Sequence, residues 1–133
     1  MASFVKAIAP RIVTSAYQVD RNLFVRPHEG KSDLRKSIPR KMRAYPRYGY
    51  PVKVLIIHDQ DSNDCYRIKN ELSALVNPDI YTIIRIACRE LENWYLGDLN
   101  AIETLYPESR ATQFHKRYKD PDNVFGSEEM KRL

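Results

Sequence analysis

The sequence lacks any apolar run that approaches the roughly 20 residues needed to span a bilayer. Its N-terminus, MASFVKAIAPRIV, has no long uninterrupted apolar core and no clear cleavage site, so a signal peptide is not expected. The only two cysteines, Cys65 and Cys88, suggest no disulfide framework, and we find no internal repeat or low-complexity tract. We therefore expect residues 1–133 to form a single domain in a reducing cytoplasm, with no membrane partner.

Charge is unevenly distributed along the chain, although the net charge is only +5. Residues 1–50 contain 11 Lys and Arg against 3 Asp and Glu, whereas residues 51–133 contain 11 against 14. A basic half joined to an acidic half suits a metal-dependent enzyme that acts on polyanions. The alternative interpretation is that the basic residues form an ordinary solvated helix face.

The stretch Val52–Glu71 combines a short apolar strand, an acidic turn and a helix. Four consecutive apolar residues, 54–57, predict a strand covered on both faces, as in the parallel sheets of α/β domains. Three acids then follow within six positions, and helical spacing of apolar residues begins near Ser62. This order places carboxylates at the C-terminal edge of a parallel sheet, where open α/β sheets bind their ligands. The acids are Asp59, Asp61 and Asp64.

The rest of the pattern predicts an α/β fold with a mainly parallel sheet. We expect three strands near 22–26, 53–58 and 80–87, because the near-equal spacing suits right-handed crossover units. Helices are predicted over 3–13, from about Ser32 through Met42, from about Ser62, and over 98–106, on both faces of a three-layer α/β/α sandwich of Rossmann-like type. From about Pro107 the chain should be a polar, loop-rich tail, with a short helix from Ser127.

Asp59 and Asp61 form a DxD pattern at the end of the central strand. A single acid there is commonly a helix N-cap, but three acids so close together repel one another unless a cation is bound. Hard oxygen ligands suit Mg²⁺ or Mn²⁺, so we predict that Asp59, Asp61 and Asp64 contribute to a metal site. Glu90 and Glu92 follow the next apolar strand, and in a parallel sheet they reach the same edge. We include Glu92 in the predicted site, although a glutamate near a helix start often only complements the helix dipole.

Other chemistry-bearing residues give weaker signals. The GKS at residues 30–32 is not a complete phosphate loop, because GxxxxGK would require glycine where Val25 stands, yet Lys31 remains a candidate phosphate contact. His28 and His58 flank predicted strand ends and are either structural or in contact with substrate or metal. The apolar stripe that Cys65 shares with the following helix favours burial over thiol chemistry.

In combination, four sequence motifs give the chain a family resemblance. The segments IIHDQDSNDC, GKSDL, RELENWYLGD and YKDPD resemble those of a bacterial group, domain-of-unknown-function family 4276, within the Toprim-like superfamily that includes the OLD-type nucleases. The resemblance covers most of the chain and implies a Rossmann-like Toprim fold whose acids hold Mg²⁺. By position, Asp59 and Asp61 match the family's DxD, Asp64 its following acid, and Glu92 the glutamate ahead of the tryptophan, here Trp94.

The chain also departs from that pattern at both ends. The Toprim glutamate ends a strand ahead of the first helix, whereas this sequence begins Met1–Ala2–Ser3 and enters a predicted helix at once. The end also comes earlier than in members of the group. We therefore expect a chain truncated at both ends, whose central strand has an open edge that promotes self-association.

Three hypotheses follow from these residues. The first is a Toprim-like metal-dependent nuclease, or its catalytically impaired remnant, in which Asp59, Asp61 and Glu92 are catalytic. Nucleic acid, DNA or RNA, would be held by Lys31, Arg35 and His28. The second is a non-catalytic module that binds a partner or regulates while keeping the fold. The third, a DxDxT phosphatase, is disfavoured because the position two residues after Asp61 is Asn63.

Overall fold

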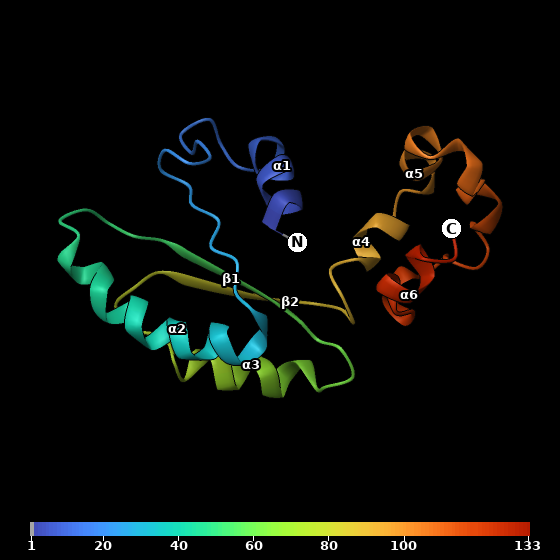
Figure 1. Ribbon diagram of the computed structural model, residues 1–133. Coiled ribbons are helices and arrows are strands. Elements are labelled where there is room, and N and C mark those ends of the chain that lie inside the picture. Colours follow the sequence, from blue (N-terminus) through green and yellow to red (C-terminus); the bar gives the residue numbers. More distant parts are fainter. Residues whose placement is uncertain (1) are drawn as a thin grey trace. The chain divides into compact units, whose positions relative to one another are not determined.

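A computed structural model describes residues 2–133 of the protein (Figure 1). These residues form two compact units, one up to Leu34 and the other spanning Arg35–Leu133, and each is described by itself. Helix α2 (Gly30–Ala44) crosses the boundary between them. None of the helices in residues 2–133 is both long enough and apolar enough to cross a membrane.

The first unit consists of helix α1 (Ala2–Ile12), a loop, and the start of α2. Pro10 lies inside α1, which ends two residues later. Residues 22–26 form no strand, so that prediction is wrong. The reason is a local turn in which the backbone N–H groups of Arg21, Asn22 and Leu23 all donate to the carbonyl of Gln18. Leu23 makes only an isolated bridge with Val19, since its N–H is already used within that turn.

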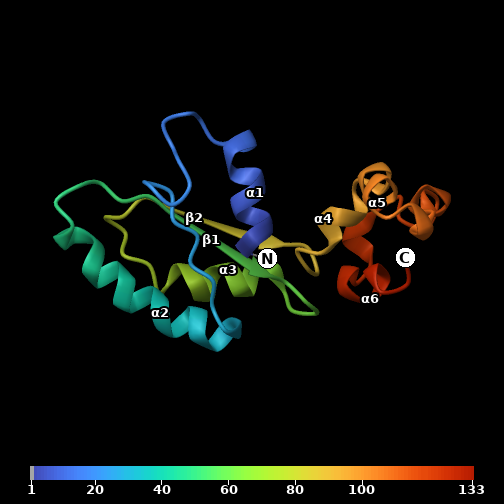
Figure 2. The same ribbon diagram turned by 45° about the horizontal axis from the view of Figure 1, so that its top comes forward.

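The second unit contains a two-stranded parallel sheet. Strand β1 (Val54–Asp59) pairs with β2 (Thr82–Ala87) in a register that sets Val54 opposite Thr82 and Asp59 opposite Ala87. The crossover between them is helix α3 (Cys65–Ser73), which runs alongside the strands in Figures 1 and 2. The predicted parallel pairing of these two strands is therefore confirmed, within a mixed α/β architecture.

Burial differs between the two faces of this sheet. Because side chains alternate along a strand, Ile56, His58 and Ile84 share one face, and all three are buried. On the other face, Leu55 is 58% exposed and Arg85 is also exposed. The expected cover on both faces of the 54–57 run therefore does not extend to Leu55.

Helices α2 and α3 lie side by side within the second unit in both views. Their apolar residues at helical spacing are buried, namely Ile38 and Met42 of α2 and Ile68 and Leu72 of α3. An ion pair between Arg35 and Glu71, 2.7 Å from Nη2 to Oε2, joins the two helices.

The C-terminal part of the second unit is a group of short helices around its own apolar cluster. Leu96, Leu99 and Ile102 are buried there together with Ala111 and Tyr118, which come from the segment predicted to be a polar tail. Asp98 caps the second of these helices by accepting a hydrogen bond from the Ala101 N–H. The elements are α4 (Asn93–Leu96), α5 (Leu99–Leu105), α6 (Gly126–Met130) and the 3₁₀ turns η2 (Pro107–Ser109), η3 (Ala111–Phe114) and η4 (Pro121–Asn123).

Candidate functional site

The loops that follow β1 and β2 are tied together at the C-terminal edge of the sheet. The backbone N–H of Gln60 donates to the carbonyl of Ala87, which extends the parallel ladder by one bond. The N–H of Asp61 donates to the carbonyl of Arg89 at 2.6 Å, and the N–H of Arg89 donates to the side-chain oxygen of Gln60 at 3.2 Å. These three bonds hold both acidic loops at one edge, as the parallel arrangement predicts.

Asp59 and Asp61 both lie where the two loops meet. Asp59 is the last residue of β1, and its Oδ1 accepts a hydrogen bond of 2.9 Å from the N–H of Leu91 in the neighbouring loop. Asp61 has a left-handed backbone, with φ of 52°, and Arg89 across from it has φ of 57°. Left-handed residues other than glycine are uncommon, and they are often found at functional sites.

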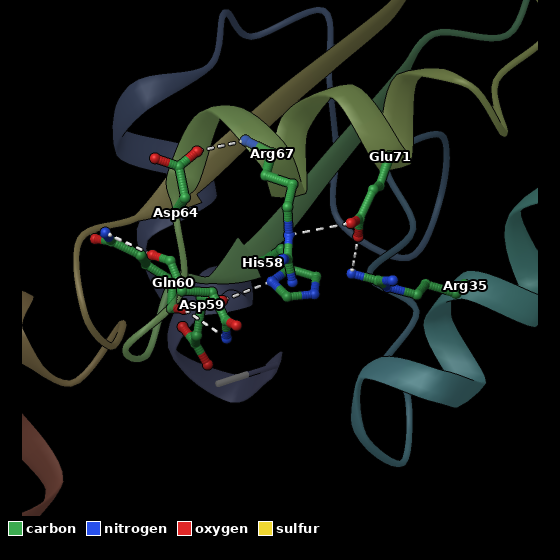
Figure 3. A network of polar contacts seen from close by, with 8 residues as sticks. Arg35, His58, Asp59, Gln60, Asp64, Arg67 and Glu71 are labelled. Atoms are coloured by element: carbon green, nitrogen blue, oxygen red, sulfur yellow. Dashed lines mark hydrogen bonds and ion pairs between the residues drawn. The ribbon is translucent and has the colours of Figure 1, made fainter.

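Asp64 has a different role, as the N-cap of α3. Its backbone is extended, and its Oδ1 accepts a hydrogen bond of 2.7 Å from the N–H of Arg67. Figure 3 shows this carboxylate beside the first turn of α3, pointing away from the carboxylate of Asp59. N-capping alone accounts for an acid at position 64, which is the ordinary role that the sequence also allows for an acid at the start of a helix.

The two glutamates of the β2 loop also differ. The carboxylate of Glu90 accepts hydrogen bonds of 2.9 Å from both the N–H and the hydroxyl of Ser127, so it binds the first turn of α6. Glu92 is half-buried and precedes α4 without capping it through its side chain. Its negative charge adds to partial burial in raising the pKa of Tyr95.

The predicted substrate-binding residues fall in both units. In the first unit, His28 Nδ1 lies 3.1 Å from the carboxylate of Asp33, and Lys31 is a half-buried residue in the first turn of α2. In the second unit, the guanidinium of Arg35 is bound to Glu71. Glu71 also pairs with Arg67, so Arg35 belongs to an ion-pair network between α2 and α3 (Figure 3).

His58 is a buried residue of β1 directly before the acidic loop. Its Nδ1 lies 2.6 Å from the carbonyl oxygen of Asp59. A carbonyl oxygen can only accept, so Nδ1 carries the proton and the ring's tautomer is fixed. His58 therefore orients the backbone at the end of β1, next to the carboxylate of Asp59.

Both cysteines are free thiols near these loops. Cys65 is the first residue of α3, and Cys88 follows β2. Partial desolvation and the nearby carboxylate of Asp122 raise the pKa of the Cys88 thiol. A raised pKa favours the neutral thiol over the nucleophilic thiolate, so the environment of Cys88 does not activate it.

Sequence reasoning missed Asn93, which ties the β2 loop to the C-terminal segment. Its side chain is 1% exposed, and its Nδ2 donates to the carbonyls of Pro121 at 2.7 Å and Val124 at 2.8 Å. Its Oδ1 accepts from the N–H of Gly126 at 2.6 Å. No pattern at helical or strand spacing marks a buried asparagine whose partners lie about thirty residues away along the chain.

Across residues 2–133, no group of three or more histidine, cysteine, aspartate or glutamate side chains is arranged to hold a metal ion. Asp59 and Asp61 have the donor chemistry for the sparser site that is proposed below. Mg²⁺ keeps several of its waters and is commonly bound through only one or two carboxylates. Asp64 is used as a helix cap, Glu90 as a partner of Ser127, and one oxygen of Asp59 accepts from the N–H of Leu91.

Comparison of the chain with protein-family models, with curated proteins and with solved structures gave no match.

Proposed function

We propose that the protein is a Toprim-like, metal-dependent phosphodiester hydrolase acting on nucleic acid, or a catalytically impaired relative of one. The observation that supports this proposal is the junction of the two acidic loops. Asp59 binds the backbone of the β2 loop through Leu91, and Asp61 binds it through Arg89. Carboxylates at the C-terminal edge of a parallel sheet are in the position where α/β enzymes bind ligands.

In this proposal, Asp59 and Asp61 would hold Mg²⁺ or Mn²⁺, and Glu92, which follows β2 and precedes α4, would orient the site. A cation held there would supply Lewis-acid chemistry for hydrolysis of a phosphodiester, by activating water and by stabilising the leaving oxygen. The chain's own contribution is to hold two carboxylates at the loop junction and to fix the end of β1 through His58. Within the second unit, Arg35 is the proposed phosphate contact, and it would share its charge with Glu71.

The finer architecture belongs to the same proposal. We propose that the β1–β2 pair belongs to a three-layer, Rossmann-like sandwich. We also propose a cytoplasmic location, which the two free thiols favour.

A thermal-shift titration with Mg²⁺ and Mn²⁺ tests the metal site. A cation that binds only the folded state stabilises it by about 2.7 kcal/mol at 100 times its Kd, so the melting temperature should rise. The double variant Asp59→Asn plus Asp61→Asn should lose that rise, since both ligand charges are removed. Asparagine tolerates the left-handed backbone at position 61, so the substitution preserves the loop.

Asp79→Asn is the matched control, because Asp79 is an exposed acid in the turn before β2, away from the loop junction. This variant should keep the full response to Mg²⁺. An equal response in the double variant would refute the assignment of Asp59 and Asp61. Cleavage of single- and double-stranded DNA and RNA, with Mg²⁺ or with a chelator, then tests the hydrolase activity itself.

A second candidate function is a non-catalytic module that binds a partner. The favouring observation is that Asp64 and Glu90 are already engaged by backbone N–H groups of α3 and α6. Binding of Mg²⁺ without cleavage of any nucleic acid would exclude an active hydrolase and leave its impaired form and this second candidate, and loss of Mg²⁺ binding as well would favour the second candidate.

A further inference from the structure

One segment of the second unit carries positive charge without any acid. Residues 35–58 contain seven Lys and Arg and no Asp or Glu. The ion pairs described within Arg35–Leu133 use Arg35, Arg67, Arg117 and Arg132. Arg35 belongs to the segment and pairs with Glu71 of α3, while the segment itself contributes no acid to offset its positive charge.

The end of the segment gathers exposed tyrosines. The 3₁₀ turn η1 (Tyr45–Arg47) follows α2, and Gly49 then adopts a left-handed backbone with φ of 63°. This turn brings Tyr48 to 5.6 Å from Tyr45 and 5.7 Å from Tyr50, measured between ring centroids. Tyr48 is 45% exposed and Tyr50 is 64% exposed, so neither ring serves mainly to fill the core.

The N-terminal ends of the two strands provide a further cation and ring. Lys53 directly precedes β1, and Tyr81 directly precedes β2, with a bond of 2.9 Å between the Val54 N–H and the Tyr81 carbonyl. The ammonium of Lys53 lies 5.9 Å from the centroid of the Tyr81 ring, which is 63% exposed. We call Arg43, Arg47, Tyr48, Tyr50, Lys53 and Tyr81 the basic aromatic surface.

An open groove of about 480 Å³ adjoins this surface. Arg43 lines it, and most of the other lining residues are apolar. The apolar lining residues are Pro39, Met42 and Pro46 from the α2 end and Leu75, Val76 and Pro78 from the segment after α3, and Asn77 is the polar one among the rest. The groove therefore offers apolar walls next to a cation that belongs to the surface.

We propose that the basic aromatic surface binds single-stranded nucleic acid, with bases stacked on Tyr48, Tyr50 and Tyr81 and phosphates held by Arg43, Arg47 and Lys53. Cations that track a backbone and aromatic rings that accept unpaired bases are the two features that single-strand binding requires. A duplex hides the faces of its bases, so exposed rings add nothing to its binding. An acidic peptide would use the cations alone, and an interfacial membrane site calls for an amphipathic helix, whereas the rings of Tyr48 and Tyr50 follow a three-residue 3₁₀ turn.

This inference goes beyond the proposed function and does not depend on it. The surface lies at the N-terminal ends of β1 and β2, whereas Asp59 and Asp61 follow the C-terminal end of β1. A strand of six residues spans about 20 Å, so the two sites are separate. Binding at the surface is measurable with a chelator present, when no metal-dependent cleavage occurs.

Fluorescence anisotropy with labelled 12-mer strands, oligo(dT) and oligo(dA), and the duplex they form, provides the test, with EDTA throughout. We expect the single strands to bind more tightly than the duplex. Tyr48→Ala and Tyr81→Ala should each weaken binding roughly 5- to 150-fold, which corresponds to about 1–3 kcal/mol for each stacked base. Tyr48→Phe keeps the aromatic ring and should keep its affinity for single strands. A loss of affinity in Tyr48→Ala can then be assigned to stacking on the ring.

The charged residues have a separate readout. The triple variant Arg43→Gln, Arg47→Gln, Lys53→Gln should reduce the slope of log Kd against log salt by about 2, since each phosphate contact to a single strand contributes about 0.7. Tyr66→Ala and Lys69→Gln are the matched controls, because both residues are exposed on α3 outside the surface. Far-UV circular dichroism confirms that each variant is folded.

Three results would overturn the inference: equal affinity for duplex and single strand, unchanged affinity in the tyrosine variants, or binding to anionic vesicles without binding to oligonucleotides. Binding that persists in the Asp59→Asn plus Asp61→Asn variant supports it, because the surface is distinct from the carboxylates. A protein that binds single strands but never cleaves them would refute an active hydrolase and leave this inference intact.

Discussion

Four aspartates that look alike in the sequence have different roles in the structure. Asp64 and Asp98 cap helices by accepting from backbone N–H groups within their own turns. Asp59 instead binds the backbone of the neighbouring loop, and Asp61 lies on a left-handed residue at the loop junction. The sequence predicts which edge of the sheet these acids reach, because parallel strands share that edge. It does not predict which acid becomes a cap, since capping depends on the backbone angles of the residue itself.

At the same scale, we predict that Asn93→Ala strongly destabilises the second unit. The substitution leaves the Gly126 N–H and the carbonyls of Pro121 and Val124 without their buried partner. Gly126 is buried, whereas Pro121 and Val124 are half-buried, so one group is left unsatisfied away from water. Such a group costs about 1–3 kcal/mol, and the free energy of unfolding should fall by about that amount. Urea denaturation followed by the fluorescence of Trp94 measures the change.

Asn100→Ala is the matched control, because Asn100 is exposed on α5. Surface substitutions of this kind usually change stability by no more than about 0.5 kcal/mol. Equal midpoints for the two variants would show that the contacts of Asn93 add no net stability.

At the scale of the elements, the sequence predicts the second unit better than the first. Strands β1 and β2 and helices α3 and α5 are found near the predicted residues, because their apolar spacing is regular and their ends carry turn or cap residues. The strand expected at 22–26 fails because a short apolar run does not reveal that its N–H groups bind the Gln18 carbonyl. The burial of Tyr118 within a polar segment also depends on partners distant in sequence.

Helix α6 leads to a prediction about pH. Glu129 is buried, and its carboxylate accepts a bond of 2.6 Å from the Tyr118 hydroxyl and pairs with Arg117 and Arg132 at 2.8 Å. The Tyr118 bond, with the two arginines, lowers the pKa of Glu129, while burial and the Glu129 bond raise the pKa of Tyr118 to about 12. A lowered carboxyl pKa stabilises the fold above the unfolded value of 4.5, and this stability is lost as the pH falls through the folded value. The raised tyrosine pKa contributes stability below pH 10 that is lost as the pH rises towards 12.

Urea midpoints measured between pH 3 and pH 11 check this prediction. Glu129→Gln should have a lower urea midpoint than the wild type at neutral pH. The difference between the two midpoints should become smaller in acid. Tyr118→Phe removes one hydrogen bond and should cost about 1–2 kcal/mol at neutral pH, with a smaller difference at high pH. Glu128 is the exposed neighbour of Glu129, so Glu128→Gln is the control. Its urea midpoint should depend on pH as that of the wild type does. If the difference in urea midpoint between Glu129→Gln and the wild type stayed constant down to pH 3, the negative charge of Glu129 would not be what stabilises the fold.

At the scale of the whole molecule, the division after Leu34 is the feature that the sequence does not reveal. It falls inside α2, whose residues Leu34, Ile38 and Met42 recur every four positions without a break. Boundaries are usually recognised from a polar or glycine- and proline-rich linker, and a continuous helical pattern conceals this one. Candidate residues that the sequence groups together therefore lie in different units, with His28 and Lys31 in the first and the aspartates in the second.

The sheet leads to a prediction about association. Among residues 2–133, β1 pairs only with β2, so each strand has one edge to which no other strand is paired. Unpaired strand edges with apolar side chains recruit other chains, and Leu55 on β1 is 58% exposed. We therefore propose that the protein self-associates through this sheet, and sedimentation velocity across a concentration series should show a growing share of dimer or larger species.

The variant Leu55→Lys should shift that equilibrium toward monomer, because a lysine on an edge strand opposes pairing with a second chain and stays solvated on the exposed face. Tyr66→Lys is the matched control, since it places the same charge at a 77% exposed aromatic on α3, outside the sheet, and it should leave the association unchanged. If the wild type sediments as a single monomeric species at every concentration, the open edges do not drive association.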